Sequence, residues 1–192
     1  METRSTLRTI IAVLVGIGIV VVFIVLMFKL FTRGGSPASP TINLGAYSST
    51  SSTATLLIDA PTNINQEHRQ VRITVSNTQN KIEIIEGYEN HVLDSKTYSN
   101  NTAAYSTFLQ ALKLANFAKG DSKSKVDYRG YCPLGDRYVY TFNDGYKDLF
   151  QYWATSCGQG TYHGNRSLTR TLFQRQIPQK DFEQLTGNIP LS

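Results

Sequence analysis

One stretch near the carboxyl end restricts the fold more than any other, because it carries a strong hairpin signal between two cysteines. The dipeptide Asp144-Gly145 separates two runs of alternating apolar residues, which is the pattern of a β-hairpin. If these two residues form the turn, the pairing that follows places Cys132 opposite Cys157. Directly opposed cysteines on antiparallel strands lie close enough to bond. The sequence therefore predicts a hairpin closed by a Cys132–Cys157 disulfide.

The register of this hairpin is open between two alternatives. A three-residue loop at 143–145 with a bulge would shift the pairing by one residue, and Pro133 and Gly135 interrupt the first strand near its start. With the two-residue turn, both cysteines share the predicted core face with Tyr138, Tyr140, Phe142, Leu149 and Trp153. The opposite face then carries Arg137, Val139, Thr141, Asp148, Phe150 and Tyr152.

The amino-terminal region contains an uncharged segment long enough to cross a membrane. No charged residue occurs in the twenty positions from Thr9 to Phe28. A helix of that length is about 30 Å long, which is the thickness of the hydrocarbon core. A cleaved signal peptide is the alternative, because Ser36-Pro37-Ala38 resembles a cleavage site. The apolar run is longer than a signal core and basic residues follow it directly, so we predict a retained transmembrane helix at 9–31.

The cysteines also determine the predicted orientation. Basic residues flank the span on both sides, so the positive-inside rule favours neither orientation strongly. A disulfide needs an oxidising compartment, which places the carboxyl-terminal part outside the cytoplasm. The predicted organisation is a cytoplasmic head at 1–8, the plasma-membrane helix, a flexible stalk at 32–53 rich in Ser, Thr, Gly and Pro, and an extracytoplasmic domain at 54–192.

Strand-like segments precede the hairpin in the outer domain. Alternation with a period of two predicts a strand at 54–59, a second hairpin at 70–88 and a further strand at 91–98. With the two strands of the closed hairpin, these segments are enough for an antiparallel sheet of about five or six strands.

Helical segments complete the predicted fold. Apolar residues recur at helical spacing within 100–120, and Asn101 is suited to cap the start of that helix. Shorter helical segments are expected at 167–176 and 180–185. The sequence therefore predicts an α+β fold, in which one main helix packs across the sheet.

The charge balance argues against one class of partner. Of the 19 Lys and Arg residues, four lie in residues 1–33, and the remainder of the chain carries 15 basic against 13 acidic residues. Proteins that bind nucleic acid usually carry a strongly basic patch or stripe. We therefore expect no nucleic-acid partner for the outer domain.

Few residues in this chain have the chemistry or spacing of an active site. Cys157 and His163 are the strongest catalytic candidates, since a thiolate beside an imidazole forms a nucleophile pair. Two cysteines in an oxidising compartment are instead expected to bond to each other. We therefore predict no catalytic residue, and the alternative is an envelope enzyme that acts on cell-wall or surface polymer with a site near Cys157 and His163. The three histidines lack metal-ligand spacing and no cofactor motif occurs, so we expect neither metal nor cofactor.

Aromatic residues beside the cysteines form the predicted ligand surface. Tyr131 precedes the first cysteine, and the glycine-rich segment after the second one carries Tyr162 and His163. Aromatic rings are common in contacts with sugars and protein partners. Tyr131, Tyr162 and His163 are thus candidates to contact an envelope protein or a glycan.

Four segments also support a resemblance: NNTAAYSTFLQAL, RGYCPLGDRYVY, WATSCGQGTYHG and LFQRQIP. Together with the basic head, the single span and the Ser/Thr stalk, they are similar to uncharacterised membrane-anchored envelope proteins of small-genome, candidate-phylum bacteria. The resemblance covers most of residues 9–178. It implies an envelope location and a cysteine pair, and it implies no activity. The expected function is a binding or structural module of the envelope, which includes a role in assembling a surface machine.

Overall fold

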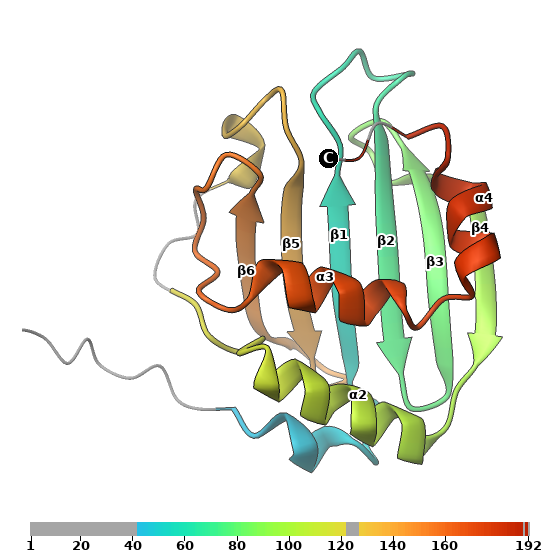
Figure 1. Ribbon diagram of the computed structural model, residues 1–192, viewed down its shortest axis with the longest axis vertical. Helices are drawn as coiled ribbons and strands as arrows, with labels where there is room; N and C mark the ends of the chain where they lie inside the picture. The colour runs from blue at the N-terminus through green and yellow to red at the C-terminus, as the bar shows by residue number, and fades with distance from the viewer. Residues whose placement is uncertain (1–41, 122–126, 190, 192) are drawn as a thin grey trace, which may run out of the picture. The chain divides into compact units, whose positions relative to one another are not determined.

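The segments in which apolar and polar residues alternate form the strands of one antiparallel sheet. The computed structural model describes residues 42–121, 127–189 and 191, which all belong to the unit Ser39–Ser192. Six strands lie in the order β4-β3-β2-β1-β5-β6 (Figure 1). They are β1 (Thr53–Asp59), β2 (Arg69–Ser76), β3 (Gln79–Glu86), β4 (His91–Ser99), β5 (Arg137–Asn143) and β6 (Asp148–Thr155). The predicted α+β class and its sheet are confirmed.

Three helices lie on the same face of the sheet (Figure 1): α2 (Thr102–Leu114), α3 (Arg166–Gln174) and α4 (Gln179–Thr186). The side chain of Asn101 accepts a hydrogen bond from the amide of Ala104 at 2.9 Å, which caps α2 as predicted. The helix is shorter than the predicted 100–120. Asn116 has a φ of 57°, a left-handed conformation that ends a helix.

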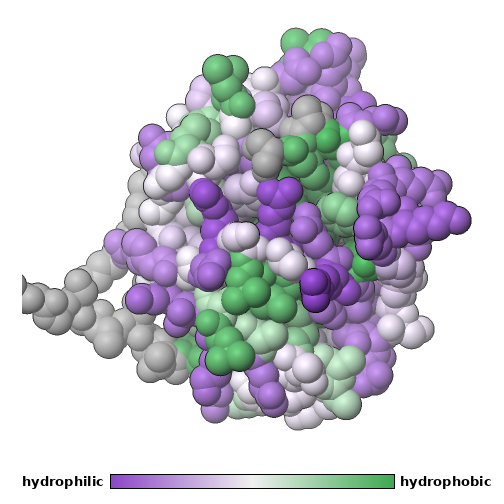
Figure 2. All heavy atoms as spheres, viewed as in Figure 1, coloured by the Kyte–Doolittle hydropathy of each residue, from purple (hydrophilic) through white to green (hydrophobic). Residues whose placement is uncertain are grey.

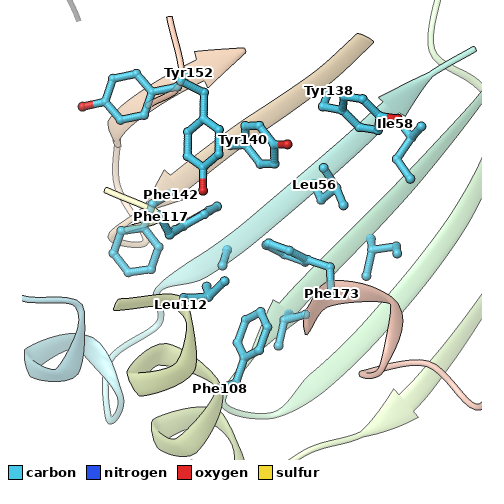
Figure 3. Close-up of a cluster of buried hydrophobic side chains, with 14 of the residues drawn as sticks. Leu56, Ile58, Phe108, Leu112, Phe117, Tyr138, Tyr140, Phe142, Tyr152 and Phe173 are labelled. Carbon is cyan, nitrogen blue, oxygen red and sulfur yellow. The ribbon is translucent and has the colours of Figure 1, made fainter. Parts of the chain in front are cut away.

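The core fills the space between the sheet and these helices. Every second residue of β1, beginning at Ala54, points toward the helices and is fully buried. Phe108 and Leu112 of α2 and Phe173 of α3 meet this face of the sheet (Figure 3). Burial of each large apolar side chain contributes roughly 1.5–3 kcal/mol. Figure 2 shows mainly hydrophilic residues on the outer surface of the helix layer, with smaller hydrophobic patches between them.

The register predicted for the β5–β6 hairpin is wrong. Tyr140 pairs with Tyr152, and Phe142 pairs with Phe150. Phe150 and Tyr152 therefore lie in the core, whereas Trp153 pairs with Val139 on the face opposite the helices. The Cys132–Cys157 bond is present, with Cα atoms 5.9 Å apart, but both cysteines lie beyond the ends of the ladder. The predicted partners were right, although the predicted strand pairing was not.

Side-chain hydrogen bonds in the turn explain this register. Asp144 Oδ1 accepts hydrogen bonds from the amides of Tyr146 and Lys147, both at 3.0 Å. The Asp144 amide donates to the Lys147 carbonyl at 3.1 Å, so the ladder closes at Asn143 and Asp148 around a four-residue loop. A bulge between Phe142 and Asn143 shifts the register further. Asp144 is thus the first residue of the loop, where its carboxylate can bind later amides.

The segment before β1 belongs to the folded domain, which corrects the predicted extent of the stalk. Leu44 begins a short 3₁₀ helix, η1 (Leu44–Tyr47), and is only 1% exposed. The ring of Tyr47 meets Phe142 edge-on at 5.4 Å. Ser52 is fully buried, and its hydroxyl lies 3.0 Å from the hydroxyl of Tyr105 in α2. These contacts order residues 42–53, which a composition rich in small polar residues had suggested would be flexible.

No helix in the described ranges combines the length and the apolar character needed to cross a bilayer. The predicted span at 9–31, the head at 1–8 and the first part of the predicted stalk lie outside those ranges.

Candidate functional site: a loop platform at one end of the sheet

Two loops meet where β1 ends and β5 begins. One is the β1–β2 connection at 60–68, and the other is the described segment 127–136 that leads into β5. Together they are called the loop platform below. The amide of Thr62 in the first loop donates to the carbonyl of Pro133 in the second at 2.7 Å. The platform is therefore one connected surface rather than two independent loops.

A buried cluster of polar and charged side chains lies beneath the platform. Asp59 pairs with Gln70 of β2 on one side and with Arg137 of β5 on the other. The alternation that turns Ile58 toward the helices turns these three side chains to the opposite face. Asp59 is fully buried, and Arg137 is 1% exposed. Their carboxylate and guanidinium groups form an ion pair, with Nε and Oδ2 3.0 Å apart.

His68 completes the cluster from the end of the first loop. Its Nε2 lies 2.6 Å from Asp59 Oδ1, and the Gln70 amide donates to the same oxygen at 3.2 Å. The other ring nitrogen, Nδ1, lies 3.3 Å from the carbonyl oxygen of Pro61. Both ring nitrogens thus face oxygen atoms. His68 therefore connects the start of the first loop, at Pro61, to the Asp59 carboxylate.

Arg137 connects the same carboxylate to the beginning of the first loop. Its Nη1 donates to the Thr62 hydroxyl at 2.8 Å, and its Nη2 donates to the Ala60 carbonyl. The planar guanidinium presents several donors in fixed directions, which suits it to hold a backbone and a carboxylate together. A buried pair of this kind adds little net stability, because desolvation offsets its attraction. Its structural effect is to fix the loop in one conformation.

The disulfide fixes the second loop in a similar way. Cys132 is bonded to Cys157, which follows β6, and the Ser156 amide donates to the Asp136 carbonyl at 2.8 Å. Cys132 has a φ of 49°, a left-handed conformation that is costly for a residue with a side chain. The covalent bond holds that conformation in place and anchors the loop to the end of β6.

A tyrosine from the β3–β4 turn seals the cluster from solvent. The ring of Tyr88 stacks on His68, with centroids 4.2 Å apart and planes 14° apart. Its hydroxyl donates to the Asn63 carbonyl at 2.9 Å, and its amide donates to Asn65 Oδ1 at 3.0 Å. His68 is only 1% exposed as a result. Tyr88 therefore closes the first loop over the imidazole.

Electrostatics near the platform follow from burial and from the Asp59 carboxylate. Burial raises the pKa of the Tyr128 hydroxyl, and the nearby charge of Asp59 raises it further. Tyr128 is therefore neutral at physiological pH. On the exposed side of the same loop, hydrogen bonds from Arg129 lower the pKa of Asp127. This second pair is open to solvent and contributes little to stability.

The His68–Asp59 pair lacks the surroundings that a catalytic dyad needs. A general base must reach a hydroxyl, a thiol or a substrate proton, but Nδ1 of His68 faces a backbone carbonyl. Both side chains are shielded, and the described residues contain no free cysteine and no group of three or more His, Cys, Asp or Glu suited to a metal ion. Here the pair holds the end of the first loop against the end of β1.

The predicted ligand residues do not form one surface. Tyr131 is half-buried, and its ring packs on Trp153 with centroids 4.9 Å apart. Tyr162 is 8% exposed, and its hydroxyl lies 2.7 Å from that of Thr169. The ring of Tyr162 packs in the core, so its predicted surface role is wrong. His163 is exposed. Cys157 has no free thiol, which removes the nucleophile from the predicted alternative with His163.

Two apolar side chains project from the loops that the cluster and the disulfide fix. Ile64 of the first loop is 62% exposed, and Leu134 of the second is 90% exposed. Sequence reasoning missed this site because its buried members lie far apart in the chain. The one available signal was a charged residue at the loop end of each strand, Asp59 in β1 and Arg137 in β5, and this signal does not show that the two side chains meet.

No known family model matches the chain, and no match to a curated protein is found.

Proposed function

We propose that this protein is a membrane-anchored, extracytoplasmic binding module of the cell envelope, and that its loop platform contacts a protein partner. The Cys132–Cys157 bond carries the proposal, because stable structural disulfides belong to oxidising compartments. The uncharged segment from Thr9 to Phe28 supports membrane attachment. Attachment there would leave the folded domain outside the cytoplasm, tethered close to the bilayer.

The rigidity of the platform supports a role in binding. Association becomes weaker when flexible loops must order themselves, so loops that are already fixed retain more of the contact energy. Here one loop is held by Asp59, His68 and Arg137, and the other is held by the disulfide. The exposed Ile64 and Leu134 then present apolar side chains without this entropic cost.

A protein partner suits these side chains better than a sugar does. Apolar residues at the centre of an interface, surrounded by polar ones, are typical of protein contacts. Ile64 lies next to polar Asn63 and Asn65, and Leu134 follows Pro133. Glycan sites depend more on exposed aromatic rings, and the two tyrosines of the platform, Tyr128 and Tyr131, are half-buried.

The location can be tested with one introduced thiol. Leu114 is 80% exposed and both native cysteines are bonded, so Leu114→Cys places one free thiol on the domain surface. A membrane-impermeant maleimide should label this variant in intact cells. Thr6→Cys, in the predicted cytoplasmic head, is the matched control and should react only after permeabilisation. The opposite labelling pattern would overturn the proposed orientation.

The binding surface can be tested by photo-cross-linking in the native envelope. A photoreactive residue in place of Leu134 should give one protein adduct, and the same residue in place of exposed Leu114 should not. The adduct at 134 should disappear when Ile64→Asp is added, because both residues belong to one contact. An adduct that persists with Ile64→Asp, an equal adduct at 114, a glycan adduct or no adduct would each refute the proposed platform contact.

A further inference from the structure

β4 is an edge strand with a strand partner on one side only among the described residues. It pairs with β3 and lies at the end of the sheet (Figure 1). All nine residues from His91 to Ser99 are exposed or half-buried. The outward-facing backbone groups of an edge strand of this length have no strand partner and can add another strand.

The pairing with β3 places the side chains of β4 on two defined faces. Asp94 and Lys96 lie opposite Ile84 and Ile82, so they belong to the helix-bearing face. Ser95, between them, points to the other face. Leu93 is the extra residue of the bulge at this point, and it is 46% exposed.

The charges on β4 are complementary to the same charges in a second copy. In an antiparallel pairing of β4 with itself, centred on Ser95, Asp94 of each copy lies opposite Lys96 of the other. The two-fold axis therefore creates two directly opposed ion pairs on one face. Leu93 lies opposite Thr97 in this register, which brings an exposed leucine against a threonine methyl group. Opposed charges and apolar pairs of this kind stabilise a ladder.

Neighbouring registers are disfavoured by the same charges. A strand must slip by two residues to keep its side chains on the same faces. Slipping one way places Lys96 opposite Lys96, and slipping the other way places Asp94 opposite Asp94. Like charges directly opposite each other destabilise a sheet. The order Asp94-Ser95-Lys96 thus selects one self-pairing among the closest alternatives.

The contact that Lys96 already makes is compatible with this pairing. Its ammonium group lies 2.7 Å from Asp181 of α4 within the same molecule. An ammonium has three donors, so it can bind Asp181 and the Asp94 of a second copy together. Within the molecule, Asp94 Oδ1 accepts from the Ser95 amide at 2.7 Å. Its Oδ2 has no donor among the described residues and can accept from a second molecule.

We propose that β4 is a homodimerisation edge, in which two copies pair antiparallel about Ser95 and extend the sheet across both molecules. The occupant is a second copy of this chain, because the charge pattern of β4 is complementary to itself. A contact of one strand pair is small, so the dimer exchanges with monomer. This inference does not depend on the proposed platform contact, which lies on loops and not on the edge.

Cysteine substitution tests the axis directly in the full chain within its membrane. The native cysteines are bonded, so an introduced cysteine is the one free thiol among the described residues. Ser95→Cys places two thiols opposite each other, where Cβ atoms are about 4.5–5.5 Å apart, and mild oxidation should give a covalent dimer. Thr97→Cys is the matched control and should stay monomeric, because its opposite residue is Leu93. Linking through Thr97→Cys, or through neither variant, would overturn the proposed register.

Charge exchange tests the pairing independently of disulfide chemistry. Asp94→Lys should weaken the dimer about tenfold, because two attractive pairs become repulsive. Adding Lys96→Asp should restore the dimer, since the exchanged charges are again complementary. The Asp181 contact is lost in the double variant, so restoration would report on the pairing between copies. A dimer insensitive to Asp94→Lys, or one that the second substitution leaves weakened, would refute the proposal.

Discussion

Removing both charges of the buried Asp59–Arg137 pair should destabilise the domain far less than the sum of removing each charge alone. Asp59→Asn keeps the shape of the side chain but leaves the guanidinium of Arg137 without its counter-charge. Because both groups are at most 1% exposed, water cannot replace the lost partner. Breaking a buried pair from one side costs about 3–5 kcal/mol. In a domain of this size, that lowers the midpoint of thermal unfolding by about 10 °C.

Arg137→Met, which removes the other partner of the pair, should lower the free energy of unfolding by less than Asp59→Asn does. Arg137→Met leaves the Asp59 carboxylate with His68 at 2.6 Å and the Gln70 amide at 3.2 Å, so the remaining charge keeps two partners. The cost is therefore expected near the lower end of the same range, about 3 kcal/mol. In the double variant no uncompensated charge remains. Its cost should be close to that of one single variant and well below the sum of both.

Thermal and urea unfolding of the full chain in mild detergent would measure this coupling. The matched control is the pair formed by Arg69 and Glu86, 3.3 Å apart, whose side chains are 27% and 28% exposed. Glu86→Gln should cost about 0–1 kcal/mol. Arg69→Met should cost more, because Arg69 also donates to the carbonyls of Gln66 and His68, but the two costs should still add nearly independently. Additive costs for Asp59→Asn and Arg137→Met would refute the view that these two groups compensate each other's burial.

Three further predictions concern other parts of the domain. Replacing Cys132 and Cys157 by alanine should lower the free energy of unfolding by about 3.5 kcal/mol, the entropy of a loop closed over 25 residues, and equal urea midpoints would contradict this. Tyr140→Phe should raise that free energy by about 1 kcal/mol, because the buried Tyr140 hydroxyl has no hydrogen-bond partner among the described residues. A lower melting temperature would exclude this reason. The hydrogen bond from Lys96 lowers the pKa of Asp181. The ionised carboxylate therefore stabilises the folded state at neutral pH, and this stabilisation is lost as the pH falls through the folded-state pKa of Asp181. The protection of α4 amides, measured as the ratio of the intrinsic to the observed exchange rate at each pH, should fall in acid, and Asp181→Asn should remove that pH dependence.

Sequence patterns predicted β1, β2 and β3 well because apolar residues at alternate positions of these strands face the core. The core-facing residues recur with a period of two: Ala54, Leu56 and Ile58 in β1, Val71, Ile73 and Val75 in β2, and Ile82 and Ile84 in β3. This periodicity reflects burial against the helices and needs no knowledge of distant contacts. The cap of α2 was predictable for a similar reason, since Asn101 binds an amide only three residues away. Local signals were sufficient wherever the stabilising contact was local.

In the β5–β6 hairpin, the predicted cysteine pair is correct although the predicted strand register is wrong. The prediction treated Asp144 as a central turn residue, whereas its carboxylate binds the amides of Tyr146 and Lys147 and makes it the first residue of a longer loop. The change moved β6 against β5 and exchanged the faces of Tyr152 and Trp153. The predicted disulfide did not depend on this register. Its cysteines lie outside the ladder, where loops bring them together.

The buried cluster beneath the platform could not be predicted from the sequence. Whether a charged residue at a strand end is buried depends on which face of that strand a loop covers. Asp136 and Arg137 occur in a stretch that resembles a polar loop, yet they are 0% and 1% exposed. Adjacent residues of an extended chain point to opposite faces, so each is buried on a different side of the sheet. Asp136 accepts from the Tyr138 hydroxyl at 3.1 Å, whereas Arg137 reaches Asp59. Only the register of β5 against β1 separates these two environments. The loops that cover Arg137 are therefore held by a carboxylate 78 positions earlier in the chain, which no local pattern in the sequence could reveal.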